Sequence, residues 1–275
     1  MTEKIHFYKA SGSGNDFIII DNFNGHYDFN FFKTLTPFVC NRNNGVGADG
    51  LIVLNKYENL DFRWDFFNSD GTVAEMCGNG SRCASRVYAM LYGKKDVSFM
   101  TLAGVIHAHV EDKMVKVRLS EPKNFIPSLE IYVDGDILKG HFINTGVPHF
   151  VMITDRIDDV PVFELGRKIR YHERFSPAGT NVNFVSPLDK KTIKVRTYER
   201  GVENETLACG TGASASALVC GYLGLVEPPV KVITSGSEIL YIHFNVKDNS
   251  FSYVYLEGEV KIICEGEIYL NEIMG

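Results

Sequence analysis

Two cysteines stand in the same unusual setting. Cys77 opens the segment Cys-Gly-Asn-Gly and Cys209 opens Cys-Gly-Thr-Gly, and the two lie close to half of the 275-residue chain apart. Small and apolar residues follow both segments, and this composition favours a helix that starts directly after each cysteine. A thiol at a helix N-terminus lies beside unpaired backbone N–H groups and a partial positive charge, which lower its pKa. We therefore predict two reactive thiols.

The flanking glycines suggest what these thiols act on. Without side chains, they let a ligand approach the backbone, and the exposed amides of a helix start can bind an anionic group. One thiolate could remove a proton from a carbon atom while the opposite thiol delivers a proton to its other face. Such two-base chemistry explains the near-symmetry, because the reverse reaction exchanges the two roles, and each transfer is general acid–base catalysis.

Other interpretations of the cysteines stay open at this point. Free cysteines are often small buried apolar residues, and two opposed thiols could also form a disulfide switch. We expect the other cysteines to serve in packing, since none has a Gly-Xaa-Gly context: Cys40, Cys83, Cys220 and Cys264. No Cys-Xaa-Xaa-Cys pair or neighbouring histidine cluster is present in the sequence, so we predict no metal site.

The elements that must position the cysteines are mostly strands. Short β-rich runs separated by Gly, Asn and Asp turns fill residues 5–120, and the same pattern of strands and turns continues after residue 121. Surface helices are expected at 29–41 and 163–172, and longer ones after Cys77 and Cys209. The second long helix has almost no charged face between Ala213 and Val219, so it should be buried nearly all round.

This pattern predicts an α+β fold of two pseudo-symmetric halves, each a mostly antiparallel β-sheet or barrel wrapped around a central buried helix. We place residues 1–121 with 259–275 in the N-terminal half, which carries Cys77. Residues 122–258 form the C-terminal half, which carries Cys209. The final strand is thereby expected to cross back to the first half.

Composition excludes several classes of partner. The net charge of −6 is spread along the chain, and 45% of residues are hydrophobic, as in ordinary globular proteins. Nothing indicates binding to nucleic acid or to an anionic membrane. No apolar run approaches the roughly 18 residues of a membrane helix. The first residues lack the apolar core of a signal peptide, so we expect a cytoplasmic protein.

An ordered set of motifs resembles the diaminopimelate epimerase family, whose members epimerise an amino acid without a cofactor. The resemblance covers nearly the whole chain. Its segments are GSGNDFI (12–18), RNNGVGADGLI (42–52), FFNSDGTVAEMCGNGSRC (66–83), TGVPHFV (145–151), GTNVNFV (179–185) and VRTYERGVENETLACGTGASA (195–215). Single glycine-rich pieces would be weak evidence, but this order together with both cysteines is specific.

The resemblance implies a role for individual residues of these motifs. Cys77 and Cys209 would be the acid/base pair, and His149 and Glu199 would tune their pKa values. The substrate-binding residues would be Asn15, Asn68, Gly78, Asn79, Asn181, Glu199, Arg200, Gly210 and Thr211. The reaction would convert LL-2,6-diaminopimelate to its meso form in lysine and peptidoglycan precursor synthesis, with no cofactor, no metal and no pyridoxal phosphate. The family also implies a homodimer.

Three positions depart from the family pattern. Val147 stands directly before Pro-His, where the family commonly has a substrate-binding asparagine. Gly50 stands where a glutamine is common, and Cys264 where some members use a tyrosine in dimer contacts. One contact to the distal end of the substrate is therefore expected to be lost or supplied elsewhere, and the family's contacts at positions 50 and 264 are not carried over to this chain.

Alternative functions remain. A proline or hydroxyproline racemase or epimerase has a similar fold and two cysteines, but that family places histidine after its first Cys-Gly, where this chain has Asn79. A related isomerase that uses a carboxylate base fits less well. A non-catalytic thiol redox sensor or ligand-binding protein also predicts reactive cysteines, but it leaves the diacid-binding groups without a purpose.

Overall fold

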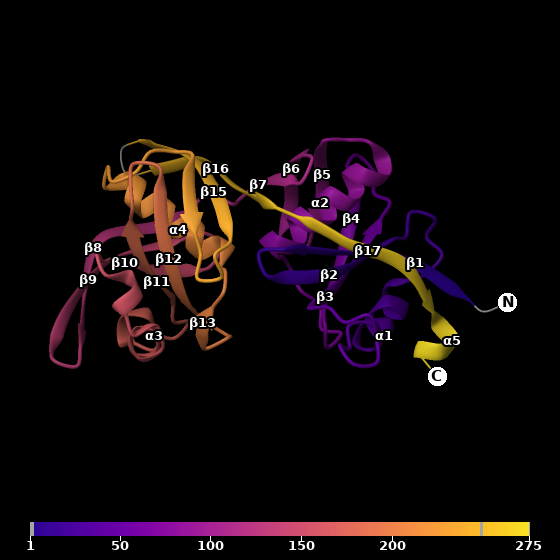
Figure 1. Cartoon of the computed structure of the whole chain (residues 1–275), viewed down its shortest axis with the longest axis horizontal. Coiled ribbons are helices and arrows are strands. Elements are labelled where there is room, and N and C mark those ends of the chain that lie inside the picture. Colours follow the sequence, from indigo (N-terminus) through magenta and orange to yellow (C-terminus); the bar gives the residue numbers. More distant parts are fainter. Residues whose placement is uncertain (1–2, 248–249, 275) are drawn as a thin grey trace. The chain divides into compact units, whose positions relative to one another are not determined.

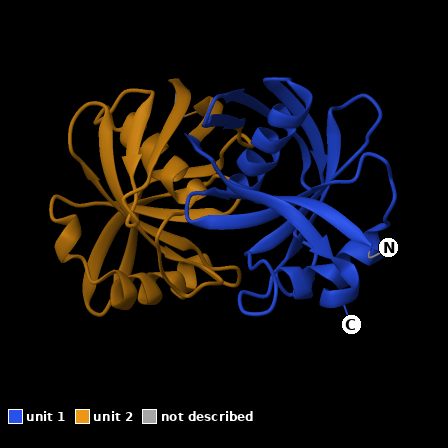
Figure 2. Cartoon of the chain, turned by 45° about the vertical axis from the view of Figure 1, so that its right-hand side comes forward, with its two compact units in different colours: residues 1–117, 258–275 blue, residues 118–257 orange. Residues whose placement is uncertain are grey.

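The computed structural model describes residues 3–247 and 250–274 and separates the chain into two compact units (Figure 2). Unit 1 comprises Met1–Val117 with Gly258–Gly275, and unit 2 comprises Arg118–Glu257. The sequence-based domain boundaries, after residue 121 and before residue 259, stay a prediction.

In unit 1 a crossover helix follows each of the first two pairs of strands (Figure 1). Its strands are β1 (Lys4–Gly12), β2 (Asn15–Asp21), β3 (Gly50–Asn55), β4 (Phe62–Asn68), β5 (Asp96–Thr101), β6 (Gly104–Glu111), β7 (Met114–Arg118) and β17 (Lys261–Tyr269). Its helices are α1 (Phe29–Val39), α2 (Gly78–Tyr92) and the short α5 (Leu270–Ile273). The C-terminal strand β17 pairs antiparallel with β1.

Unit 2 is built from β8 (Lys123–Val133), β9 (Asp136–Asn144), β10 (Pro148–Ile153), β11 (Asn181–Pro187), β12 (Thr192–Glu199), β13 (Asn204–Thr206), β14 (Val230–Ile233), β15 (Ile239–Lys247) and β16 (Ser250–Glu259). Its helices are α3 (Val162–Arg170) and α4 (Gly210–Tyr222), with 3-10 turns at Ile157–Asp159 and Glu173–Phe175. The expected helices are therefore present, whereas sequence patterning missed the three-residue strand β13 and the helix α5.

The two units repeat one topology. In unit 1 the pairs β17–β1, β1–β2, β3–β4 and β5–β6 are antiparallel, and β2–β3 and β4–β5 are parallel. In unit 2 the pairs β8–β9, β9–β10, β11–β12 and β14–β15 are antiparallel, and β10–β11 and β12–β14 are parallel. Each parallel pair needs a crossover, and the crossovers contain α1 and α2 in unit 1 and α3 and α4 in unit 2. The predicted pseudo-symmetric α+β fold is confirmed.

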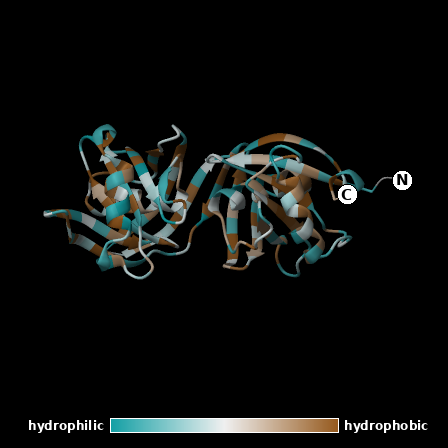
Figure 3. Cartoon of the chain, turned by 90° about the horizontal axis from the view of Figure 1, so that it is seen from below, coloured by the Kyte–Doolittle hydropathy of each residue, from teal (hydrophilic) through white to brown (hydrophobic). Residues whose placement is uncertain are grey.

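A long helix lies in the core of each unit. Side chains of α2 pack in one cluster with Phe62, Trp64 and Phe66 of β4, while Phe67 belongs to a second cluster on the α1 side of the sheet. Successive side chains of β4 point to opposite faces of the sheet, which places them in two different clusters. Figure 3 shows hydrophobic and polar residues alternating along the strands.

The burial of helix α4 explains why it contains small and apolar residues and almost no charged ones. Every residue from Gly212 to Cys220 is buried. Small side chains allow close packing, because a Cβ atom on Gly221 would lie 2.5 Å from the Phe244 ring. The expectation of a helix buried nearly all round is confirmed for this segment.

Candidate active site

Cys77 lies where the sequence predicts it, at the N-cap of α2. Its backbone is extended (φ −146°, ψ 121°), and its Sγ accepts a hydrogen bond from the Gly80 N–H at 3.4 Å. The thiol is half-buried. A Cβ atom on Gly78 would meet no atom within 4 Å, so the backbone at the start of the helix is open to a ligand.

Asn15 and Asn79 contact each other beside this helix start. The Asn79 Nδ2 donates to the Asn15 Oδ1 at 2.8 Å, and the Asn15 Nδ2 donates to the Asp49 Oδ2 at 2.9 Å. The guanidinium of Arg82, which is fully buried, donates to the Asn79 Oδ1 at 2.8 Å and also contacts Ser13. Both predicted asparagines thus have fixed amide orientations, and sequence reasoning missed Arg82 and Asp49.

Asn68 and Gly50 lie opposite each other on β4 and β3. Asn68 is exposed at the end of its strand, and its Nδ2 donates to the Thr72 Oγ1 at 3.0 Å. A Cβ atom on Gly50 would lie 2.6 Å from the Phe67 carbonyl oxygen. A side chain at position 50 would therefore require the Phe67 backbone to move.

Cys209 caps α4 as predicted, but its electrostatic environment differs from the prediction. Its thiol is buried, and burial, followed by the nearby Glu199 carboxylate, raises the pKa of Cys209 to about 12. Hydrogen bonds from Thr211 and from the Gly212 and Thr211 backbone act in the opposite direction and are weaker. The predicted lowering of the pKa is therefore wrong for Cys209, because desolvation outweighs the helix N-terminus.

Glu199 forms a polar pair with Cys209. Burial raises the pKa of the Glu199 carboxyl, and hydrogen bonds from Thr206 and Cys209 partly offset that effect. The Thr206 Oγ1 donates to the Glu199 Oε2 at 3.0 Å. A carboxyl with a raised pKa that accepts a hydrogen bond from the thiol lies where it could exchange a proton with Cys209.

The remaining predicted residues of unit 2 gather at the β10–β11 pair, where His149 lies opposite Asn181. The Asn181 Oδ1 accepts the Arg200 backbone N–H at 2.7 Å, and the Arg200 Nη1 donates to the Ala178 carbonyl at 3.0 Å. His149 is fully buried, and burial together with the Arg200 charge lowers its pKa to about 3. His149 is therefore neutral at physiological pH.

Val147 and the start of α4 lie on either side of Thr145. The Val147 carbonyl accepts the Thr145 N–H at 3.2 Å, and the Thr145 Oγ1 donates to the carbonyl of Thr211 at 3.0 Å. The loop before β10 is thus bonded to the Cys209 motif of the same unit. The valine offers no side-chain hydrogen bond there.

Asn183 and Thr197 are functional candidates that sequence reasoning missed. Both are buried, and the Asn183 Nδ2 lies 2.9 Å from the His149 Nδ1. The signal was present, since Asn183 follows Asn181 by two residues and so shares its face of β11.

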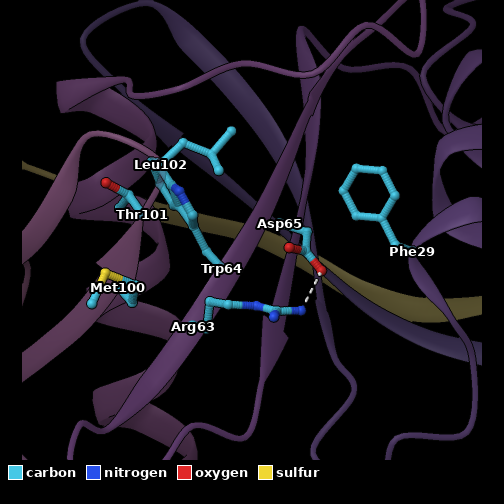
Figure 4. Close-up of a pocket in the computed structure, with 7 residues that line it drawn as sticks. All are labelled: Phe29, Arg63, Trp64, Asp65, Met100, Thr101 and Leu102. Atoms are coloured by element: carbon cyan, nitrogen blue, oxygen red, sulfur yellow. Dashed lines mark hydrogen bonds and ion pairs between the residues drawn. The ribbon is translucent and has the colours of Figure 1, made fainter.

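A pocket of about 320 Å³ in unit 1 contains none of the predicted site residues (Figure 4). Its lining residues are Phe29, Arg63, Trp64, Asp65, Met100, Thr101 and Leu102. The Arg63 guanidinium reaches the Asp65 carboxylate at 3.3 Å, as Figure 4 shows, so the charged groups of this pocket neutralise each other.

Among residues 3–247 and 250–274, no group of three or more His, Cys, Asp or Glu side chains could hold a metal ion. Within the same ranges, no helix has the length and apolar character needed to cross a membrane.

Comparison with known proteins gives the same assignment over most of the chain. Residues 7–124 and 141–263 match the family model described as diaminopimelate epimerase. The diaminopimelate epimerase of Aquifex aeolicus (strain VF5) is 49% identical, with 96% of this chain and 98% of that protein covered. That of Archaeoglobus fulgidus is 41% identical, with 98% of each covered.

Solved structures resemble this chain at lower identity. A PhzF-family phenazine biosynthesis protein from Bacillus anthracis has a TM-score of 0.71 at 14% identity, covering 97% of this chain and 99% of its own. A hydroxyproline epimerase from Agrobacterium vitis has a TM-score of 0.67 at 13% identity, covering 100% and 96%. At these identities the likeness establishes a shared fold and nothing more.

Proposed function

The chain belongs to the diaminopimelate epimerase family, and we propose that it interconverts LL- and meso-2,6-diaminopimelate for lysine and peptidoglycan precursor synthesis. One observation carries the proposal: each unit presents a Cys-Gly-Xaa-Gly segment whose cysteine caps a long helix. Inversion of a carbon centre by removing a proton from one face and returning one to the other needs two acid/base groups, and the two thiols supply them.

We assign Cys77 and Cys209 as the acid/base pair. One sulfur, as thiolate, takes the α-proton and becomes a thiol. The other, as thiol, gives its proton to the opposite face of the α-carbon and becomes a thiolate. The electron pair left by the C–H bond is held in the carboxylate-stabilised carbanion until the new C–H bond forms. No oxidant, reductant or cofactor is needed for this balance.

The first turns of α2 and α4 would hold the reacting carboxylate. The first N–H groups of a helix have no intrahelical acceptor and favour an anion. Gly78 and Asn79 in one unit and Gly210 and Thr211 in the other occupy these positions. These donors would also stabilise the negative charge that develops on the carboxylate in the transition state.

The protonation of Cys209 suggests how the cycle starts. With a pKa raised to about 12, Cys209 is a thiol at neutral pH. Its bonded neighbour Glu199 is the group that can accept this proton when Cys209 must act as the base.

The distal end of the substrate is assigned to side chains outside the helix starts. Arg200 can bind its carboxylate, while asparagine amides offer both donors and acceptors to its zwitterionic groups. These asparagines are Asn15, Asn68 and Asn181. We further propose that the chain works as a homodimer in the cytoplasm, as the family pattern implies.

Isotope exchange tests the reaction. The protein is incubated with LL-diaminopimelate in heavy water without added cofactor, and NMR follows the α-proton. We expect meso product that carries α-deuterium. Absence of both outcomes would refute the proposal, and turnover of proline or hydroxyproline instead would establish the alternative activity.

The pair of thiols is tested by substitution. Cys77→Ala and Cys209→Ala should each lose at least about 100-fold of the epimerisation rate, because each removes one proton-transfer group. Cys264 is exposed, so the packing role expected for it is wrong. Cys264→Ala changes a thiol outside the site, is the matched control and should keep full activity. Substantial epimerisation by either site variant would contradict the two-base assignment.

A further inference from the structure

Three buried polar side chains form a chain across the sheet of unit 2. Asn183 on β11 lies between His149 of β10 and Thr197 of β12 and is fully buried. The Thr197 Oγ1 donates to the Asn183 Oδ1 at 2.9 Å, and the Asn183 Nδ2 lies 2.9 Å from the His149 Nδ1. Polar groups are stable in such a place only when they are hydrogen-bonded.

The order of donors defines where the histidine proton lies. Because the Thr197 hydroxyl donates to the Asn183 Oδ1, the Asn183 amide NH₂ faces the His149 imidazole. An amide N–H can only donate, so the His149 Nδ1 accepts, and the proton of the neutral ring is on Nε2.

The Nε2 of His149 is buried and has no hydrogen-bond partner among residues 3–247 and 250–274. A buried donor without a hydrogen-bond partner is unfavourable. Arg200 lies near enough for its charge to lower the pKa of His149. The His149 Nε2–H and the Arg200 guanidinium could therefore bind an anionic group of a ligand together.

The same asparagine touches the Cys209 motif. A Cβ atom on Gly212 would lie 2.4 Å from the Asn183 Oδ1, 3.2 Å from the Thr197 Oγ1 and 3.3 Å from the Cys209 Sγ. Only a glycine lets the first turn of α4 come this close to β11. Asn183 therefore contacts both the histidine and the helix turn that bears the thiol.

We propose that Asn183 is a positioning residue, which holds His149 as the neutral Nε2–H tautomer and sets the distance of the Cys209 helix turn from the sheet. The inference rests on the proposed function and adds to it that the Nε2–H of His149 donates to a carboxylate of the bound substrate. Thr197 acts through Asn183, because its hydroxyl decides which end of the amide faces the ring.

The test is Asn183→Asp in the full chain labelled with ¹⁵N-histidine. A carboxylate accepts on both sides, so it should draw the proton to Nδ1, and the imidazole ¹⁵N shifts report which nitrogen is protonated. The His149→Gln spectrum assigns the signal. We expect Nε2–H in the wild type, Nδ1–H in the variant, and a fall in epimerisation of about 10- to 100-fold, the size of effect expected when a buried hydrogen bond is lost.

A second pair of variants covers the case in which Asn183→Asp does not fold. Thr197→Val removes the hydroxyl and should give mixed tautomers with reduced activity, while Thr197→Ser keeps the hydroxyl and should behave as wild type. Wild-type His149 protonated on Nδ1, or unchanged tautomer and activity in Thr197→Val, would overturn the assignment. The NMR measurement needs no turnover, so a chain that fails to epimerise refutes the proposed function separately.

Discussion

At the scale of single residues, the Glu199–Cys209 pair decides when the second thiol is reactive. Burial and the Glu199 charge both raise the pKa of Cys209. Replacing the carboxyl by a neutral amide removes the second cause, so Glu199→Gln should lower the pKa of Cys209. At a fixed pH near 8 a larger fraction is then thiolate, and alkylation of Cys209 should accelerate several-fold while epimerisation falls, because the proton acceptor is lost.

Mass spectrometry of alkylated peptides measures this change thiol by thiol. Cys220 is an internal control, since burial alone raises its pKa to about 12, and its slow alkylation should not change. The exposed Cys264 reports reagent activity in every sample. Unchanged alkylation of Cys209 in Glu199→Gln would show that the carboxylate does not control this thiol.

At the scale of elements, the first turns of α2 and α4 differ in how much room their glycines have. A Cβ atom at Gly212 would overlap Asn183, whereas one at Gly78 meets nothing within 4 Å. Gly212→Ala should therefore lose about 1–3 kcal/mol of stability by overpacking, together with activity. Gly78→Ala should keep the stability and lose activity, because its methyl group stands where the carboxylate is proposed to approach.

Urea unfolding and the exchange assay together separate the two effects. Equal destabilisation by both alanines would contradict the packing difference. Full activity of Gly78→Ala would contradict the placement of the carboxylate at the start of α2.

The elements also show what could be predicted from the sequence. The helices after Cys77 and Cys209 were predictable because their small residues are confined between glycine-rich starts and β-rich runs. The parallel pairs at the crossovers, β2–β3 and β10–β11, were not, because strand direction depends on topology that periodicity does not record. The raised pKa of Cys209 could not be predicted either. The sequence indicates a helix N-terminus at this position, but it does not indicate how deeply the thiol is buried.

At the scale of the whole chain, buried thiols connect the fold to pH. Burial raises the pKa of Cys40 and of Cys220 to about 12, and burial with Glu199 does the same for Cys209. Between pH 9, the ordinary thiol value, and these raised values, the unfolded chain releases protons that the folded chain keeps. Stability is therefore fully present below pH 9 and falls as the pH rises.

Each such thiol contributes a slope of about 1.4 kcal/mol per pH unit once the unfolded thiol is ionised. Urea unfolding under reducing conditions at pH 8 to 10 should show this loss, and Cys220→Ala should reduce the slope of unit 2 without changing that of unit 1. Cys40→Ala should do the reverse, because Cys40 belongs to unit 1 and Cys220 to unit 2. If the units unfold as separate domains, the two variants move separate transitions; if the chain unfolds as one, both alter a single slope. An alkaline slope that neither variant changes would show that these thiols do not couple the fold to pH.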